Sequence, residues 1–111
     1  MKRIEAIVRP HKVSGILAAL ARQGLTNVTV LETLGLARQL SFSHTYELAS
    51  VNEETQTGLI PKRLLLLFVE DQQVQSVIDM IQPLAMTGEP GDGVVAVSQI
   101  DQIVNIRPKQ K

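Results

Sequence analysis

One run of side chains restricts the folds open to this chain more than any other feature. Residues 64–69 read Leu-Leu-Leu-Leu-Phe-Val, so all six side chains are apolar. The run is too short to span a bilayer as a helix, which takes roughly 20 apolar residues. A strand built from it is apolar on both faces, and each face must be covered by other parts of a folded protein. Any fold for this chain must therefore bury the strand from two sides.

Two amphipathic helices are predicted to cover one of these sides. Ser14 can cap a helix that runs to Gln23 with one apolar stripe, and Gly24 suits the left-handed position after its end. Asp71 can cap a second helix, whose apolar residues follow the i, i+3, i+4, i+7 spacing until Pro83 ends it. Both helices are expected to face a shared core.

Strands alternate with these helices along the chain. The predicted strands are residues 2–9, 28–36, 60–69 and 94–98, with a short fifth at 102–106. The order β-α-β, long loop, β-α-β matches the ferredoxin-like α+β arrangement, in which two helices cover one side of an antiparallel sheet. We expect residues 1–111 to form a single domain of this kind. The other side of the sheet is then expected to be buried against further copies of the chain in a closed homo-oligomer.

A long loop separates the two halves of this arrangement. Residues from about 37 to 59 keep no sustained period of either kind. A loop of about 20 residues is unusual in so small a domain, and loops of that length are generally functional or disordered. We expect this long loop to carry function.

Composition excludes several classes of function. Eleven basic residues balance eleven acidic ones, so the field that draws proteins to nucleic acid or anionic lipid is absent. The chain has no cysteine, which excludes disulfides and thiolate chemistry. Its first residues mix charged with apolar side chains, unlike a signal peptide. We expect a cytoplasmic protein that is not embedded in a membrane and does not bind nucleic acid.

Catalytic and metal sites have little support in the sequence. His11 follows the end of a strand and His44 stands alone in the long loop, whereas a metal site needs three or four converging ligands. Neither a Ser-His-Asp arrangement nor a pair of carboxylates with suitable geometry stands out. A small enzyme on the same fold, such as an acylphosphatase, would need an anion loop that this sequence lacks. We therefore expect no enzyme.

Residues 87–93, here called the glycine turn, read Thr-Gly-Glu-Pro-Gly-Asp-Gly and place three glycines between a helix and a strand. The N–H groups of such a turn can close around an anion, although glycines between elements are as often only a turn. Asp92 would repel a phosphate unless it orients the backbone or meets a ligand hydroxyl. The turn is the first candidate for a binding site.

A second group of polar residues brackets the long loop. Gly35, Arg38 and Gln39 stand at the end of the strand before it, and Lys62 and Arg63 follow it. If the loop folds back on itself, the two later cations come near Arg38. A local anion site is then predicted despite the balanced net charge.

These residues resemble those of the P-II signal-transduction proteins, which regulate nitrogen and carbon metabolism by sensing nucleotides and 2-oxoglutarate. The matching stretches cover nearly the whole chain: residues 1–10, Gly24, residues 29–30, Gly35, residues 38–39, residues 60–62, the glycine turn and residues 106–107. The resemblance implies a ferredoxin-like βαββαβ fold, a homotrimer and an adenine nucleotide in each of three clefts between subunits.

The resemblance also implies roles for single residues. The expected nucleotide-binding residues are Thr29, Gly35, Arg38, Gln39, Lys62, Thr87, Gly88, Gly91, Asp92, Gly93 and Arg107. The last three residues of the glycine turn would wrap the phosphates, and Thr29 and Gly35 would line the adenosine side. Arg107 would reach in from a neighbouring subunit. Gln39, beside Arg38 at the phosphate end, would help hold Mg²⁺ through a bound nucleotide, and Lys62 would pair with a 2-oxoglutarate carboxylate.

Three departures from the family pattern bear on the ligand. Val94 stands where the family usually has a phosphate-binding lysine, and Asn105 stands where one of two C-terminal arginines is usual. Each charge-assisted contact is worth about 1.5 to 3 kcal/mol, so we expect a shift from ATP toward ADP or AMP, or loss of the site. Ala37 replaces a glycine and restricts the hinge of the loop. The small effector, 2-oxoglutarate or bicarbonate, stays open.

Residues 37–59 correspond to the effector-binding loop of the family, but they do not keep its pattern after residues 44–45, His-Thr. Tyr46 is interpreted as structural or target-facing, with modification as the less favoured alternative. Ser50 is a less favoured candidate phosphoacceptor. The favoured hypothesis is a regulator that binds an adenine nucleotide and controls a transporter or metabolic enzyme through this loop. The alternative is a trimeric interaction module that has lost nucleotide sensing and binds its partner constitutively.

Overall fold

The computed structural model describes residues 1–38, 50–52 and 57–108. Two short 3-10 turns (Pro10–Lys12 and Asp71–Gln73) each lead directly into a helix. The regular elements are β1 (Lys2–Val8), α1 (Val13–Arg22), β2 (Val28–Arg38), β3 (Ser50–Asn52), β4 (Thr57–Val69), α2 (Val74–Ala85) and β5 (Val94–Gln99). Two β-α-β halves separated by a loop confirm the predicted ferredoxin-like α+β fold.

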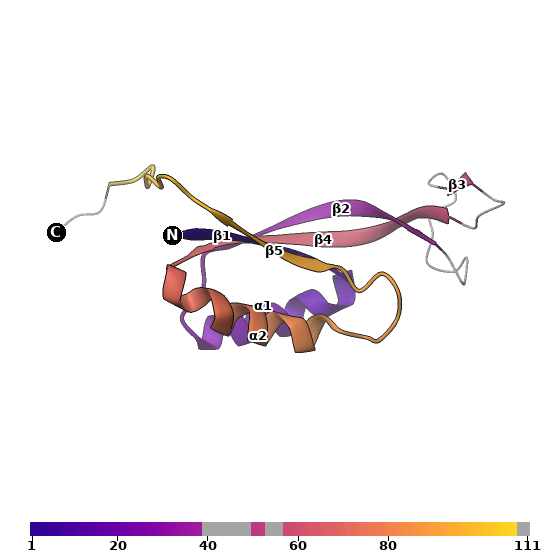
Figure 1. Cartoon of the computed structure of the whole chain (residues 1–111), viewed down its shortest axis with the longest axis horizontal. Helices are drawn as coiled ribbons and strands as arrows, with labels where there is room; N and C mark the ends of the chain where they lie inside the picture. The colour runs from indigo at the N-terminus through magenta and orange to yellow at the C-terminus, as the bar shows by residue number, and fades with distance from the viewer. Residues whose placement is uncertain (39–49, 53–56, 109–111) are drawn as a thin grey trace.

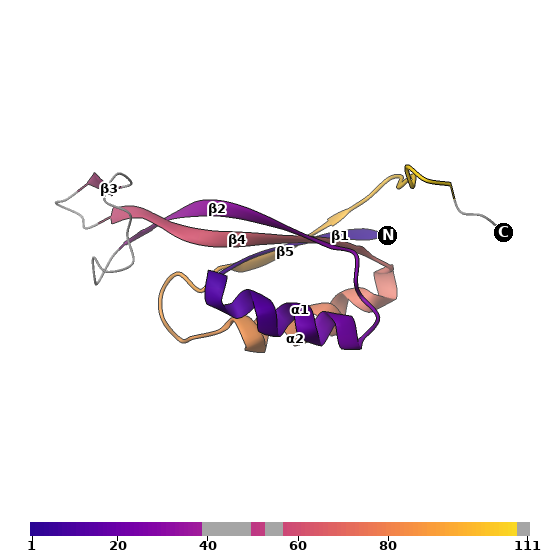
Figure 2. The same cartoon turned by 180° about the vertical axis from the view of Figure 1, so that it is seen from behind.

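The strands form one antiparallel sheet in the order β2-β4-β1-β5, and β3 pairs with the start of β4. β1 lies in the middle, so that Ala6 pairs with Leu65 of β4 on one side and with Val95 of β5 on the other. Both helices lie on the same side of this sheet (Figures 1 and 2). Among the described residues, no helix lies on the opposite side.

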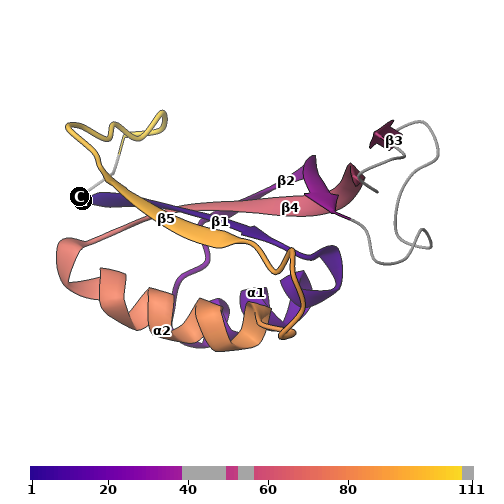
Figure 3. The same ribbon diagram turned by 45° about the vertical axis from the view of Figure 1, so that its right-hand side comes forward.

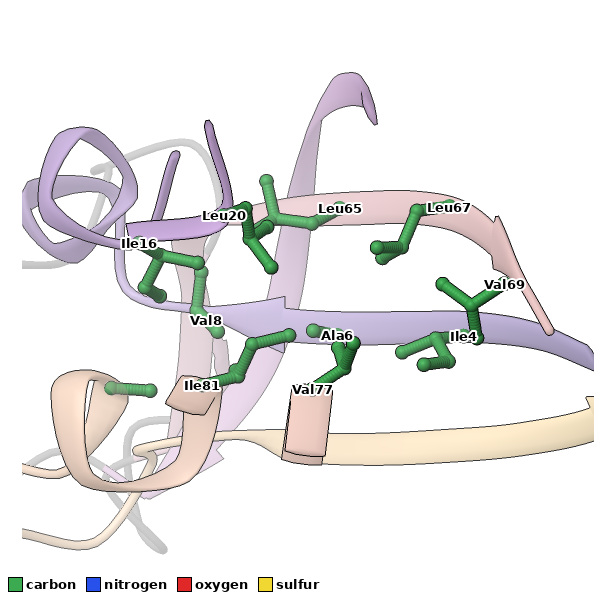
Figure 4. Packing of buried hydrophobic residues seen from close by; sticks show 11 residues of the cluster. Ile4, Ala6, Val8, Ile16, Leu20, Leu65, Leu67, Val69, Val77 and Ile81 are labelled. Atoms are coloured by element: carbon green, nitrogen blue, oxygen red, sulfur yellow. The ribbon is translucent and has the colours of Figure 1, made fainter. Parts of the chain in front are cut away.

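The hydrophobic core fills the space between the sheet and the two helices (Figure 4). Alternate residues of β1 and β4 point into it, and one stripe of each helix meets them. The largest fully buried side chains are Ile4, Val8, Ile16, Leu20, Leu65, Leu67, Val69, Val77 and Ile81. Within β1, Ile4, Ala6 and Val8 are buried, so alternate residues of this predicted strand point into the core.

The strand that is apolar on both faces is the second half of β4. Leu65, Leu67 and Val69 pack on the helices, and the residues between them point to the opposite side of the sheet. On that side Phe68 is 44% exposed, and Leu31 of the neighbouring strand β2 is 43% exposed. The single chain therefore covers one face of β4 and leaves part of the other face open.

Both helices begin differently from the prediction. A 3-10 turn leads directly into α1, so Ser14 lies inside the helix, and the prediction that it caps the helix is wrong. The turn before α2 is capped by Glu70 in a capping box, in which the Glu70 N–H donates to Gln73 Oε1 at 2.8 Å. Asp71 is therefore not the cap, and its carboxylate instead accepts a hydrogen bond from the Met1 amino group at 3.0 Å.

Two further boundaries differ from the prediction. Pro83 lies inside α2, which continues to Ala85, because the Met86 N–H still reaches the Gln82 carbonyl at 3.2 Å and closes the last turn around the proline. Residues 102–106, predicted as a short fifth strand, form no strand. Their apolar side chains remain exposed, since none of the described strands pairs with them.

The long loop is shorter than the sequence predicts. β2 continues to Arg38, and β4 already begins at Thr57, where the two residues pair. Beyond the helices these strands run on as a projecting two-stranded ribbon (Figures 1 and 3). Residues 57–58, Thr-Gly, are not apolar, so the sequence gives no alternating apolar pattern at the start of β4. Tyr46 and His44 lie outside the described residues.

Candidate functional site

The glycine turn connects the end of α2 to the start of β5 (Figure 1). Its three glycines all have positive φ angles, which are 86° at Gly88, 92° at Gly91 and 110° at Gly93. A side chain at Gly93 would also meet the β1 backbone, because an added Cβ would lie 2.8 Å from the carbonyl carbon of Ile7 and closer to its oxygen. The backbone conformation of the turn therefore favours glycine at these three positions, whether or not a ligand binds.

The Asp92 carboxylate holds the turn together from inside. Its Oδ2 accepts hydrogen bonds from the N–H groups of Thr87 at 2.8 Å and Gly88 at 3.0 Å. Its Oδ1 accepts from the Thr87 hydroxyl and from Arg9 Nε, the latter at 3.0 Å. These hydrogen bonds hold the pKa of Asp92 well below its usual range. The Thr87 hydroxyl contributes most, the Thr87 N–H comes next, and Arg9 and Gly88 contribute less. The carboxylate therefore orients the backbone of the turn, which is one of the two roles that would make Asp92 compatible with a bound phosphate.

The N–H groups at the start of the turn are already in use. Thr87 and Gly88 donate to Asp92, and the Glu89 N–H donates to the Thr87 hydroxyl oxygen at 3.1 Å. Pro90 has no N–H to offer. Within the described part of the chain, the N–H groups left for an anion are those of residues 91–93.

Two cations from the sheet hold three consecutive residues of the turn. Arg9, directly after β1, donates from Nη2 to the Pro90 carbonyl at 2.7 Å as well as to Asp92. Lys62 of β4 donates to the Gly91 carbonyl. The Lys62 residue is only 5% exposed, and this burial, followed by the nearby Arg9 charge, lowers its pKa, which Asp92 partly offsets. The turn is thus fixed to the sheet by two partly or fully buried positive groups.

Gly35 lets the Lys62 side chain lie across the ribbon. A Cβ added at Gly35 would lie 3.1 Å from Lys62 Cγ, so the lysine passes directly over β2 toward the turn. At the far end of the same side chain, Nζ lies near Gly91. The structure therefore brings Gly35 and Lys62 of the sheet together with the glycine turn. The turn holds five more of the residues expected to bind a nucleotide: Thr87, Gly88, Gly91, Asp92 and Gly93.

Other predicted residues lie elsewhere in the single chain. Thr29 is exposed on β2, where it pairs with Leu66. Arg107 is exposed in the segment after β5, which leaves the sheet at the end opposite the glycine turn (Figure 1). Neither side chain reaches the turn of its own chain.

The register also separates the residues at the base of the long loop. The Arg38 backbone pairs with Thr57, five residues before Lys62, a separation of about 16 Å along a strand. The strand pairing does not place Arg38 beside Lys62 as the folded-back loop suggested. Gln39 lies outside the described residues.

Arg9 is the site residue that the sequence analysis missed. It was assigned only to the end of the first strand, and its partners lie 81 and 83 residues further along the chain. The one available signal was a cation directly before Pro10, at a strand end that the fold places beside the start of β5.

A cavity of about 400 Å³ borders the end of the turn, and its lining includes Ile78 and Met86 as well as Gly93 and Val94. Asp92 is the only charged residue among the described residues that line it, and its carboxylate is already bonded within the turn. The cavity is therefore mainly apolar and does not contain the two cations.

In residues 1–38, 50–52 and 57–108, no set of three or more His, Asp or Glu side chains is arranged to hold a metal ion. None of the described helices is both long enough and apolar enough to cross a membrane.

Comparison with known proteins gives a consistent answer over the whole chain. The family model described as "Nitrogen regulatory protein P-II" matches residues 1–110. A nitrogen regulatory protein P-II from Microchaete diplosiphon is 37% identical over 111 residues, which is 100% of this chain and 96% of the relative. A "Nitrogen regulatory protein P-II 2" from Methanothermobacter thermautotrophicus is 36% identical over 107 residues, 96% of this chain and 90% of the relative.

Proposed function

The chain belongs to the nitrogen regulatory protein P-II family of signal-transduction regulators, which are not enzymes, and we propose that it binds an adenine nucleotide at the glycine turn. One observation carries the proposal: the turn is fixed to the sheet by Arg9 and Lys62 and leaves the N–H groups of residues 91–93 for a ligand. Backbone N–H groups in such a turn bind phosphate well.

The subunit arrangement proposed for this site is a homotrimer with clefts between subunits. The open side of the sheet supports it, because Phe68 and Leu31 are partly exposed there in the single chain. The place of Arg107 supports it too, since that arginine could reach a glycine turn only in another copy. Thr29 and Gly35 would line the adenosine side of such a cleft.

The nucleotide proposed for the site is ADP or AMP in preference to ATP. Val94 directly follows the turn and is 60% exposed, in the position where the family usually has a lysine. The two cations beside the turn, Arg9 and Lys62, already donate to its carbonyl oxygens. Some of the N–H donors of these two cations are therefore already engaged and are not available to a third phosphate.

Effector binding and output are part of the same proposal. Gln39 would help hold Mg²⁺ through the nucleotide, and Lys62 would exchange the Gly91 carbonyl for the carboxylate of 2-oxoglutarate or for bicarbonate. Nucleotide and effector would favour one arrangement of the long loop over others, and the favoured arrangement would engage a transporter or enzyme. The ligand must bind these arrangements with unequal affinity.

Calorimetry tests the proposal. ATP, ADP and AMP are titrated separately, each with and without Mg²⁺ and with 2-oxoglutarate or bicarbonate. We expect ADP or AMP to bind more tightly than ATP. Arg107→Ala should weaken binding, although Arg107 lies far from the turn of its own chain, whereas the exposed Arg22→Ala at the end of α1 should not. No binding of any nucleotide would contradict the proposal.

A second function is favoured by the same bonded cations and by Val94. The chain would then be a trimeric interaction module that binds its partner constitutively and has lost nucleotide sensing. Arg38→Ala separates the two functions in a pull-down of the partner with and without ADP. The regulator loses its dependence on nucleotide in this variant, and the constitutive module shows no such dependence before or after the change.

A further inference from the structure

We infer that Arg9 is a positioning residue of the glycine turn, which aims the backbone at a phosphate without touching the phosphate itself. The inference rests on the proposed function of the turn. Arg9 belongs to no part of the turn and lies directly after β1.

The Arg9 guanidinium makes two contacts at once from two different nitrogen atoms. Nε donates to Asp92 Oδ1 at 3.0 Å, and Nη2 donates to the Pro90 carbonyl at 2.7 Å. The side chains of Arg9 and Asp92 are only 21% and 24% exposed. A planar fork suits two acceptors in fixed directions, whereas a lysine is a point donor on a flexible stem.

The contact with Pro90 determines where the next N–H points. The Pro90 carbonyl and the Gly91 N–H belong to one peptide plane, and the described chain has no cis peptide bond. In a trans peptide the C=O and N–H point in opposite directions. By holding the carbonyl, Arg9 turns the Gly91 N–H away from itself.

Lys62 acts in the same way on the following peptide plane. Its bond to the Gly91 carbonyl turns the Asp92 N–H away from the sheet cations. Two of the three N–H groups left for an anion are therefore aimed by the two cations. A phosphate bound by these groups lies on the far side of the peptide planes from Arg9.

The contact with Asp92 extends the effect to the start of the turn. Asp92 receives Arg9 on one oxygen and the N–H groups of Thr87 and Gly88 on the other. Loss of Arg9 would leave Oδ1 held by the Thr87 hydroxyl alone, so that the carboxylate turns more easily away from both N–H groups. The arginine therefore acts through Asp92 and Pro90 on the whole turn.

Amide exchange and calorimetry on three full-length variants test this role. In Arg9→Gln we expect the amide exchange of Thr87 and Gly88 to rise at least about tenfold and ADP affinity to fall by a similar factor. Arg9→Lys should restore part of both. Arg3→Gln is the matched control, because Arg3 lies on β1 and, among the described residues, its side chain donates to the Ser98 hydroxyl at 3.2 Å and pairs with Glu5, away from the glycine turn. Unchanged protection of Leu20 amide in the core shows that each variant is folded.

A double-mutant cycle with Asp92→Asn separates positioning from direct contact. If Arg9 acts through Asp92, the two losses of ADP affinity are not additive. Additive losses, or a loss of affinity in Arg9→Gln with unchanged exchange at Thr87 and Gly88, would overturn the inference. If the unchanged protein binds no nucleotide, the proposed function fails, and the exchange data alone still decide whether Arg9 positions the turn.

Discussion

The two connections that lead from a helix into a strand are built in opposite ways. After α1, the chain closes on the helix that it leaves: the Gly24 N–H donates to the Ala21 carbonyl at 2.9 Å, and the Leu25 N–H donates to the Leu20 carbonyl at 2.9 Å. This is a local backbone cap of the kind expected after a helix. Both bonds join backbone groups within six residues of each other and use no side chain.

The glycine turn after α2 depends on side chains from distant parts of the chain. Asp92 replaces the helix carbonyls as the acceptor for the first N–H groups, and Arg9 and Lys62 attach the turn to the sheet. The comparison shows why only this connection is suited to bind a ligand. A local cap uses its N–H groups to close the helix, whereas a turn held by side chains leaves some of them for a ligand.

The largest difference between the two connections is expected from single Gly-to-Ala changes. Gly93→Ala places a Cβ against the Ile7 backbone at a φ of 110° and should cost at least about 3 kcal/mol. Gly24→Ala has a φ of 79° but open space around it, and should cost about 1 to 2 kcal/mol. Urea unfolding followed by circular dichroism measures both. Equal losses would show that the glycine turn is no more constrained than the cap.

A smaller effect separates the two connections by pH. Hydrogen bonds keep the pKa of Asp92 below its usual range, so its stabilising effect is full above the ordinary carboxyl pKa of about 3.9 and is lost as the pH falls further. The amide protection of Thr87 and Gly88 should stay constant between about pH 5 and 8 and fall in acid. Protection of Leu25, whose acceptor is a backbone carbonyl, should fall only when the whole domain unfolds. A loss near neutral pH at Thr87 would contradict this assignment.

The smallest effect is expected from Lys62→Met. Methionine keeps much of the buried aliphatic part of the side chain and removes an ammonium group whose pKa is lowered by burial. It also leaves the Gly91 carbonyl without its donor. We expect these changes nearly to cancel, within about 1 kcal/mol near pH 7. Because a lowered lysine pKa makes stability rise with pH toward the ordinary value of about 10.4, Lys62→Met should flatten that rise. Unfolding curves at several alkaline pH values measure it, and an unaltered slope would contradict the role of burial.

The sequence predicts the core well and the helix ends less well. Alternation in β1 and the helical spacing of Val77 and Ile81 follow from burial on one face, which the order of residues records directly. Ser14 and Asp71 both look like caps, yet 3-10 turns and a capping box one residue away satisfy the backbone instead. Several local solutions compete at a helix end, and their energies differ by little.

Only part of the candidate site could be predicted from the sequence, and the reason differs from that for the helix ends. The glycine turn is continuous in sequence, and its glycines mark it. Arg9 and Lys62 meet it through the pairing of β1 with β4 and β5, so their contacts depend on tertiary structure. Nothing in the residues next to Arg9 shows that its guanidinium faces a carboxylate far along the chain.

Backbone amide shifts during titration with ADP test the central claim most directly. The account predicts that the N–H signals of Gly91, Asp92 and Gly93 shift with ADP concentration, while those of Gly24 and Leu25 in the local cap stay in place. Saturating ADP that leaves the three turn signals unchanged would contradict it.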